Sequence, residues 1–186
     1  MDKISNDPAV EMARIVRPLT EIAERELVAR LAREVPTGGL IVEVGALYGG
    51  MTAVMALANA GAFITTMDNF SWHPEDDQKS SKALVEQNMA RLGITNVEVL
   101  VGDSIALGRN WKREIDLVWI DGGHTYKHAY SDLICFGSCS AVIAIHDYGN
   151  PHLECVKRAV SDFLEACPEW GVAETVHTTA VLRKSA

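Results

Sequence analysis

The sequence of 186 residues lacks several features that mark whole classes of protein. No apolar run approaches the roughly 18 residues that a membrane-spanning helix needs, and residues 1–14 contain no apolar core of the secretory type. The four cysteines form no C-x-x-C pair, so we expect reduced, buried thiols. These absences predict a cytoplasmic protein that does not bind a membrane.

Positive charge is also scarce: the chain has 17 Lys and Arg residues and 25 Asp and Glu residues, which gives a net charge of −8. Phosphates would meet a repulsive field, which argues against nucleic acid as a substrate or partner. The length fits a single domain, in which we expect a helical segment at residues 1–36 and a core at 37–186. The amphipathic N-terminal helices bury their apolar stripe either on their own sheet or on a second subunit, and we expect the latter arrangement, a homodimer.

Short apolar runs alternate with helical patterns along the chain. The predicted strands are residues 40–44, 62–67, 97–101, 115–120 and 141–145, with two more short strands within 171–183. The predicted helices lie at 8–34, broken near Pro18, and at 50–59, 81–92, 125–136 and 151–166. This alternation predicts an α/β, Rossmann-like fold with a doubly wound, seven-stranded, mostly parallel sheet and an antiparallel C-terminal edge strand.

The motif E-x-G-x-x-x-G begins within the first predicted strand and consists of Glu43, Gly45 and Gly49. The glycines let the backbone turn sharply and approach a ligand, and the next helix points free N–H groups back at that ligand. The spacing differs from the G-x-G-x-x-G of dinucleotide enzymes, which disfavours a nicotinamide dehydrogenase. It favours an adenosine ligand without a pyrophosphate, and so S-adenosyl-L-methionine as cofactor.

Polar residues follow the predicted strands, whose carboxyl ends share one edge of a parallel sheet. Asp68 is placed to accept the ribose hydroxyls of the cofactor, although a cap or an Asx-turn is the alternative. Asp103 and Ser104 are placed to read the adenine amino group. Glu43 either faces the methionine part or accepts backbone N–H groups beneath the loop. We therefore expect one cofactor site at this edge.

Five segments, EVGALYGG, MDNF, LGITNVEVLVGDS, DLVWIDGGHTYKHAYSDL and IAIHDY, resemble class I S-adenosylmethionine-dependent methyltransferases. Within that class, the chain resembles the small metal-dependent O-methyltransferases of the catechol and macrolide-sugar types, over residues 40–163. The resemblance implies O-methylation of a small hydroxylated acceptor, a sugar or a phenolic, which Trp72 and Tyr148 would flank unless they only pack at the rim. The alternative is a non-catalytic S-adenosylmethionine-binding protein with a vestigial metal site.

The resemblance also implies a site for a divalent cation, Mg²⁺ or Mn²⁺. Its ligands would be Asp121 after the fourth strand and the adjacent His146 and Asp147 after the fifth. His146 replaces the more usual acid, which shifts the preference toward Mn²⁺ or another transition metal. Catalysis would use Asp121 together with His124 as general base, whereas His128 is expected to be merely solvated. In a metal-free alternative, Asp121 only orients its loop and His124 acts alone.

Overall fold

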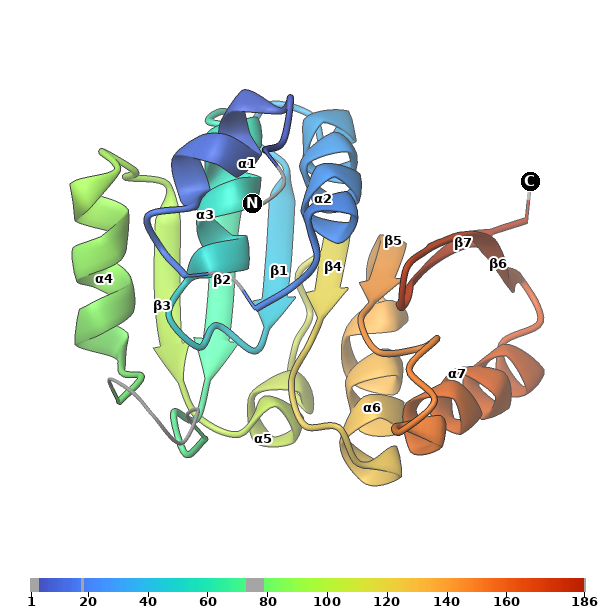
Figure 1. Cartoon of the computed structure of the whole chain (residues 1–186). Helices are drawn as coiled ribbons and strands as arrows, with labels where there is room; N and C mark the ends of the chain where they lie inside the picture. Colours follow the sequence, from blue (N-terminus) through green and yellow to red (C-terminus); the bar gives the residue numbers. More distant parts are fainter. Residues whose placement is uncertain (1–3, 18, 73–78, 186) are drawn as a thin grey trace.

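The computed structural model describes residues 4–17, 19–72 and 79–185, which form a seven-stranded sheet with helices on both faces (Figure 1). The strands are β1 (Leu40–Val44), β2 (Phe63–Asp68), β3 (Val97–Val101), β4 (Ile115–Ile120), β5 (Ser140–Ile145), β6 (Trp170–Val176) and β7 (Thr179–Lys184). Their order is β3-β2-β1-β4-β5-β7-β6. Strands β1 to β5 pair in parallel, and β7 is antiparallel to both β5 and β6. The predicted fold is confirmed.

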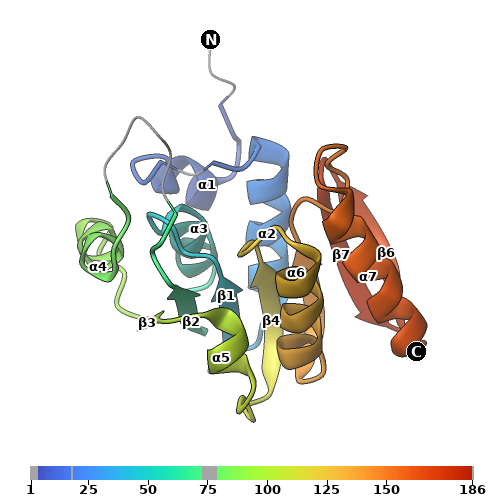
Figure 2. The ribbon, with the colours of Figure 1, turned by 90° about the horizontal axis from the view of Figure 1, so that it is seen from below.

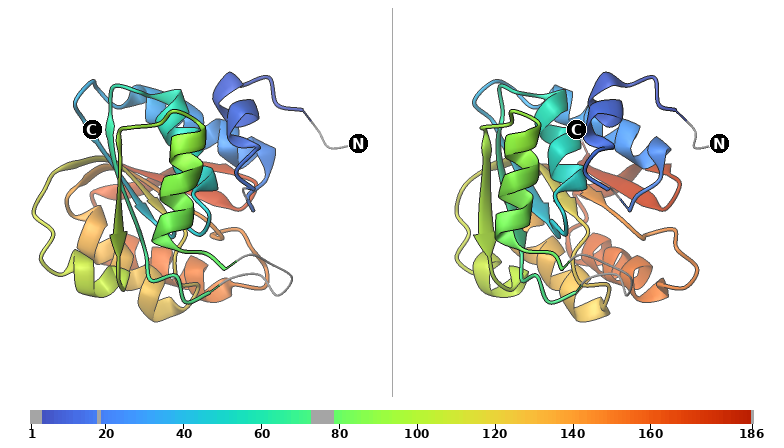
Figure 3. Two further views of the ribbon diagram at one scale, coloured as in Figure 1. Left: turned by 90° about the vertical axis from the view of Figure 1, so that its left-hand side faces the viewer. Right: turned by 60° about the vertical axis from the view of Figure 1, so that its left-hand side comes forward.

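Two layers of helices enclose the sheet, as Figure 2 shows from the side of the strands' carboxyl ends. One face carries α1 (Pro8–Ala13), α2 (Ile22–Glu34), α3 (Gly50–Ala58) and α4 (Lys82–Arg91), and the other carries α5 (Ser104–Gly108), α6 (Tyr126–Asp132) and α7 (Glu154–Ala166). Figure 3 shows α4 running alongside the edge strand β3. Within the described ranges, no helix is long and apolar enough to cross a membrane.

Some helix boundaries differ from the prediction. The helix expected to begin at Pro151 begins at Glu154, because the chain first makes a turn. The short helix α5 was not predicted; Asp103 caps it by accepting a hydrogen bond from a backbone N–H. Helix α6 continues into a π-helical turn at Leu133–Gly137. The predicted break at Pro18 lies outside the described residues.

Strand β1 separates two apolar cores, because successive side chains of a strand point to opposite faces. All five of its residues are buried. Ile41 belongs to the cluster beneath α2 and α3, whereas Val42 and Val44 belong to the cluster beneath α6 and α7. Glu43 therefore shares the α3 face with Ile41. This periodicity explains where the Glu43 side chain lies.

The carboxyl ends of the central strands are tied together just beyond the last ladder pairs. Gly45 N donates to Met67 O at 2.9 Å, and Asp121 N donates to Val44 O at 2.8 Å. His146 N donates to the carbonyl at the end of β4 at 3.0 Å. The residues that follow β1, β4 and β5 consequently have fixed backbone positions at one edge.

Candidate functional site

A cavity of about 460 Å³ lies at this edge, within the range of small-molecule sites. Its wall comes from the segments after β1 to β5 and from the connection between α1 and α2. The wall contains most of the predicted site residues: Gly45, Asp68, Asp103, Ser104, Asp121, His124, His146 and Asp147. Two others, Glu43 and Gly49, are not part of it.

The first loop brings the chain close to the segment after β4. Gly45 has φ 98°, and a Cβ there would lie 2.1 Å from Asp121 O, so no other residue fits. Gly49, with φ 84°, precedes α3 and faces Val85 and Met89 of α4. Its role is thus to pack α3 against α4, and the neighbouring Gly50 lines the cavity instead.

Glu43 lies behind the first loop. Its side chain is 0% exposed and accepts a hydrogen bond from the Thr52 hydroxyl of α3. Burial raises the pKa of Glu43 to about 7. Glu43 therefore lies away from the cavity wall, because α3 covers its face of β1, and it accepts from the Thr52 hydroxyl rather than from the backbone N–H groups that the alternative expected.

Asp68 links the first and second loops. Its Oδ2 accepts from Leu47 N at 2.8 Å, and its Oδ1 accepts from Phe70 N at 2.7 Å. The second contact is the Asx-turn that was considered as an alternative. Each carboxylate oxygen still has a further lone pair, so this structural role is compatible with accepting hydroxyl groups in the cavity.

The segment after β3 meets the start of α6 across the cavity. Asp103 uses Oδ1 to cap α5, and its Oδ2 lies 3.8 Å from His128 Nε2. Thr125 Oγ1 lies 2.8 Å from His128 Nδ1. His128 lines the cavity together with Asp103 and Ser104. The His128 side chain is 36% exposed, as expected for a solvated residue, and its ring also faces Asp103 at the start of α5.

Four side chains at the ends of β4 and β5 form a compact cluster. Asp121, His124, His146 and Asp147 each offer a ligand atom within 4.8 Å of the others. His146 Nδ1 lies 3.1 Å from Asp121 Oδ1 and 3.3 Å from Asp147 Oδ2. His124 Nε2 lies 3.3 Å and 3.1 Å from the same two oxygens. Adjacent ligands around a cation with bonds of ~2.1–2.3 Å lie about 3 Å apart, so the cluster has the right spacing.

One atom of this cluster is better suited to bind a cation than to form a hydrogen bond within the protein. His146 Nδ1 is buried and makes no hydrogen bond within the described part of the chain, although two carboxylates lie close. A buried polar atom without a hydrogen bond is costly. Asp147 has φ 61°, a strained conformation for a residue other than glycine. Both observations support a ligand site.

The electrostatics of the cluster are strongly negative. Burial lowers the pKa of His146, but the carboxylates of Asp121, Asp147 and Glu24 outweigh it and raise the pKa to about 12. Burial raises the pKa of Asp121, but His124 and His146 hold it below its usual value. The hydrogen bond with Asp121 raises the pKa of His124. The site therefore favours positive charge, either on a histidine or on a bound cation.

Glu24 is a site residue that the sequence did not reveal. It lies on α2, is 1% exposed, and its Oε2 is 3.2 Å from His146 Nε2. Burial raises the pKa of Glu24, but hydrogen bonds from His146 and Thr178 keep it well below its usual range. The two partners are 122 positions apart, so no spacing rule could pair them.

The rim of the cavity only partly matches the prediction. Trp72 and Leu19 both line the wall, and they are 64% and 51% exposed. Tyr148 is absent from the wall, because its ring packs on the core beneath α7, with Lys157 Nζ 6.0 Å from the ring centre. Residues 73–78 of the loop after β2 lie outside the described residues.

Comparison with known proteins identifies the family. A model of the methyltransferase domain matches residues 42–148. The chain belongs to this methyltransferase family. The enzyme is thus a class I S-adenosylmethionine-dependent methyltransferase, as the motifs predicted. No curated protein is significantly similar to the methyltransferase in sequence.

Solved structures share the fold of this methyltransferase. The O-methyltransferase NovP is 16% identical with a TM-score of 0.75, over 89% of this chain and 81% of NovP. Cofactor-bound Rv0187 from MTB is 19% identical with a TM-score of 0.73, over 96% and 90%. The SAH-bound Podospora anserina methyltransferase PaMTH1 is 16% identical with a TM-score of 0.68, over 96% and 86%. At these identities the likeness shows the fold alone.

Proposed function

We propose that the methyltransferase methylates a hydroxyl oxygen of a small acceptor with the assistance of a divalent cation. The observation that carries this proposal is the cluster of Asp121, His124, His146 and Asp147 in the cavity wall. His146 Nδ1 lies buried between two carboxylates of this cluster and makes no hydrogen bond among the described residues. The O-methyltransferase NovP, which has the same fold, supports oxygen as the acceptor atom.

The cofactor would occupy the part of the cavity between the first and third strands. Asp68 would accept the ribose hydroxyls with its remaining lone pairs, while Asp103 and Ser104 would face the adenine. Gly45 would let the backbone of the first loop approach closely. When bound, S-adenosylmethionine supplies a methyl group on a positively charged sulfur.

The cation would be held by Asp121, His146 and Asp147. When bound, it supplies Lewis acidity that lowers the pKa of an acceptor hydroxyl. His124, whose side chain is 45% exposed, would take the hydroxyl proton on Nε2. The acceptor oxygen then forms a bond to the methyl carbon as the carbon–sulfur bond breaks, and the electron pair stays on the neutral sulfur of S-adenosylhomocysteine.

Exposed apolar side chains at the mouth favour a ring-shaped acceptor. Trp72 and Leu19 line the same cavity as the four-residue cluster, and both side chains are largely exposed. An aromatic face stacks on a phenolic ring or on the apolar face of a sugar. We therefore propose catechols and hydroxylated sugars as the acceptor classes to test.

The test is methylation of a panel of catechols and sugars by enzyme stripped with EDTA and then reloaded. We expect EDTA to abolish turnover, and Mn²⁺ or Mg²⁺ to restore it. Asp147→Ala should lose turnover while it retains S-adenosylhomocysteine affinity. Glu165→Gln, which removes an exposed charge on α7, is the matched control and should remain active.

Two outcomes would refute parts of the proposal. Full activity of the stripped enzyme would exclude the cation and leave His124 as the main catalytic group. Cofactor and Mn²⁺ binding without turnover of any acceptor in the panel would favour the non-catalytic alternative.

A further inference from the structure

Glu24 is a buried carboxylate whose two oxygens both act as acceptors. Its Oε1 accepts from Thr178 N at 3.1 Å and from the hydroxyls of Thr178 and Thr179 at 2.7 and 2.9 Å. Its Oε2 accepts from Glu21 N at 3.1 Å and lies 3.2 Å from His146 Nε2. Hydrogen bonds from these four donors favour the charged carboxylate over the neutral acid, so Glu24 acts as an acceptor toward His146 as well.

The hydrogen between Glu24 and His146 therefore belongs to Nε2 of the histidine. A neutral imidazole with its hydrogen on Nε2 has a lone pair on Nδ1. That Nδ1 lies 3.1 Å from Asp121 Oδ1 and 3.3 Å from Asp147 Oδ2. Once the ring loses its Nδ1 proton, the lone pair is directed at the space between the two carboxylates, where a cation would take the place of that proton.

We propose that Glu24 is a positioning residue that fixes the tautomer and the ring orientation of His146, so that Nδ1 binds the cation. This inference rests on the proposed cation-assisted function. Glu24 itself does not line the cavity, so it acts through His146. Metal-bound histidines generally donate their second N–H to a carboxylate or carbonyl group, and the loss of that partner typically costs 10–100-fold in metal affinity.

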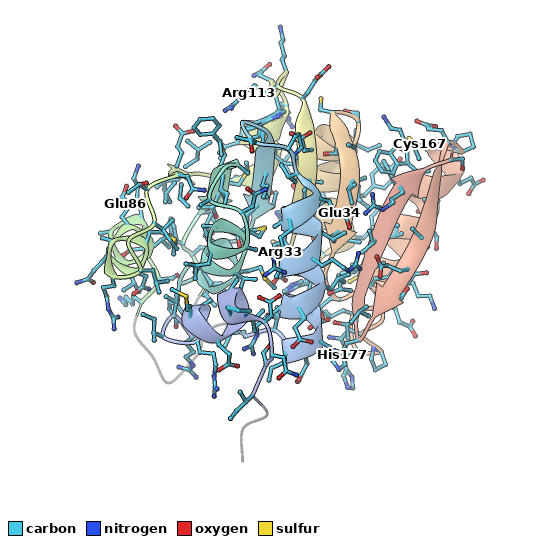
Figure 4. The ribbon with its side chains drawn as sticks, turned by 90° about the horizontal axis from the view of Figure 1, so that it is seen from above. Arg33, Glu34, Glu86, Arg113, Cys167 and His177 are labelled. Atoms are coloured by element: carbon cyan, nitrogen blue, oxygen red, sulfur yellow. The ribbon has the colours of Figure 1, made fainter. Side chains whose placement is uncertain are left out.

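The support behind His146 comes from two distant parts of the chain. Glu24 lies in the first turn of α2, and its Thr178 partner lies in the turn between β6 and β7. In Figure 4, His177 of that turn and Glu34 lie near opposite ends of α2. An imidazole nitrogen suits Mn²⁺ better than it suits Mg²⁺, which prefers oxygen ligands. The arrangement therefore favours a transition-metal cation, such as Mn²⁺, over Mg²⁺.

The first experiment compares Mn²⁺ binding to the unaltered protein and to the Glu24→Gln variant, whose glutamine side chain has the same size as glutamate but no charge. Free Mn²⁺ is counted by EPR, and pulsed EPR of bound Mn²⁺ detects a histidine nitrogen ligand. We expect the affinity to fall about 10–100-fold and the nitrogen signal to weaken. S-adenosylhomocysteine affinity should stay unchanged. Glu34→Gln, at the other end of α2, is the matched control and should bind Mn²⁺ normally.

The second experiment repeats the comparison in a His146→Asp background. An aspartate has no tautomer to fix, so Glu24→Gln should cost little Mn²⁺ affinity there. An equal loss in both backgrounds would mean that Glu24 acts through charge or folding alone, and would overturn the positioning role. Unchanged affinity of Glu24→Gln would overturn it too. A wild-type protein that binds no Mn²⁺ would refute the cation proposal and this inference together.

A measurement on the unaltered protein covers the case in which Glu24→Gln does not fold. Nitrogen-15 NMR of labelled histidines in the protein loaded with diamagnetic Zn²⁺ distinguishes Nδ1–H from Nε2–H. We expect the hydrogen of His146 on Nε2, with the resonance identified by its loss in His146→Asp. A hydrogen on Nδ1 would overturn the inference.

Discussion

Glu43 permits a quantitative test of how burial and charge compete behind the first loop. Its carboxylate is 0% exposed, accepts a hydrogen bond from Thr52, and has its Oε1 without a hydrogen-bond partner among the described residues. Burial raises its pKa from 4.5 to about 7. We expect Glu43→Gln, of equal size and without charge, to stabilise the fold at alkaline pH and to change its stability little in acid.

The sign follows from which state binds the proton more tightly. As pH rises from 4.5 to about 7, the unfolded chain releases a proton that the folded Glu43 still holds. The free energy of unfolding therefore falls through this range and levels off above it. The rise in pKa from 4.5 to about 7 corresponds to about 3 kcal/mol, at about 1.4 kcal/mol per pH unit. A glutamine does not titrate and avoids this loss.

The assay is urea unfolding of both proteins at about pH 5 and about pH 8, with equal m-values required. The stability gap between Glu43→Gln and wild type should widen by about 2–3 kcal/mol between these pH values, or about 4–12 °C in Tm. Burial also raises the pKa of Asp132 to about 7. Asp132 titrates in both proteins, so its contribution to the stability gap cancels. A gap that is equal at both pH values would refute the reasoning.

Two further predictions concern the cofactor half of the site. Asp68→Ala should weaken S-adenosylmethionine and S-adenosylhomocysteine binding about ten- to a hundredfold in calorimetry, because a charge-assisted hydrogen bond contributes about 1.5–3 kcal/mol; unchanged affinity would remove Asp68 from the site. Gly45→Ala should lower Tm sharply and abolish cofactor binding, because its Cβ would lie 2.1 Å from Asp121 O. Gly38→Ala is its control, because Gly38 has φ 81° and open space around the missing Cβ, so it should lose only about 1–2 kcal/mol. Equal losses in the two variants would show that the contact with Asp121 is unimportant.

Local patterns were sufficient to predict the sheet and most of the cavity wall. A buried apolar run followed by a glycine or an aspartate marks a strand and its carboxyl end, and parallel strands place these ends together. Asp68, Asp121 and Asp147 were found in this way. Side-chain direction was harder to predict. Glu43 lies inside β1 rather than after it, and it faces α3 because that helix covers its face of the strand.

Backbone strain connects the two halves of the site and explains why sequence patterns missed part of it. The described residues other than glycine with positive φ are Leu47 (49°), Phe70 (53°), Asp147 (61°) and His177 (53°). Asp68 accepts the N–H groups of the first two, and Glu24 accepts the N–H of the residue after His177. Each such conformation costs on the order of 1–3 kcal/mol, and the hydrogen bonds to Asp68 and Glu24 help to offset this cost at Leu47, Phe70 and His177. Because Glu24 and the turn that contains His177 are far apart in the chain, only the folded structure reveals that Glu24 hydrogen-bonds this turn and lies against His146.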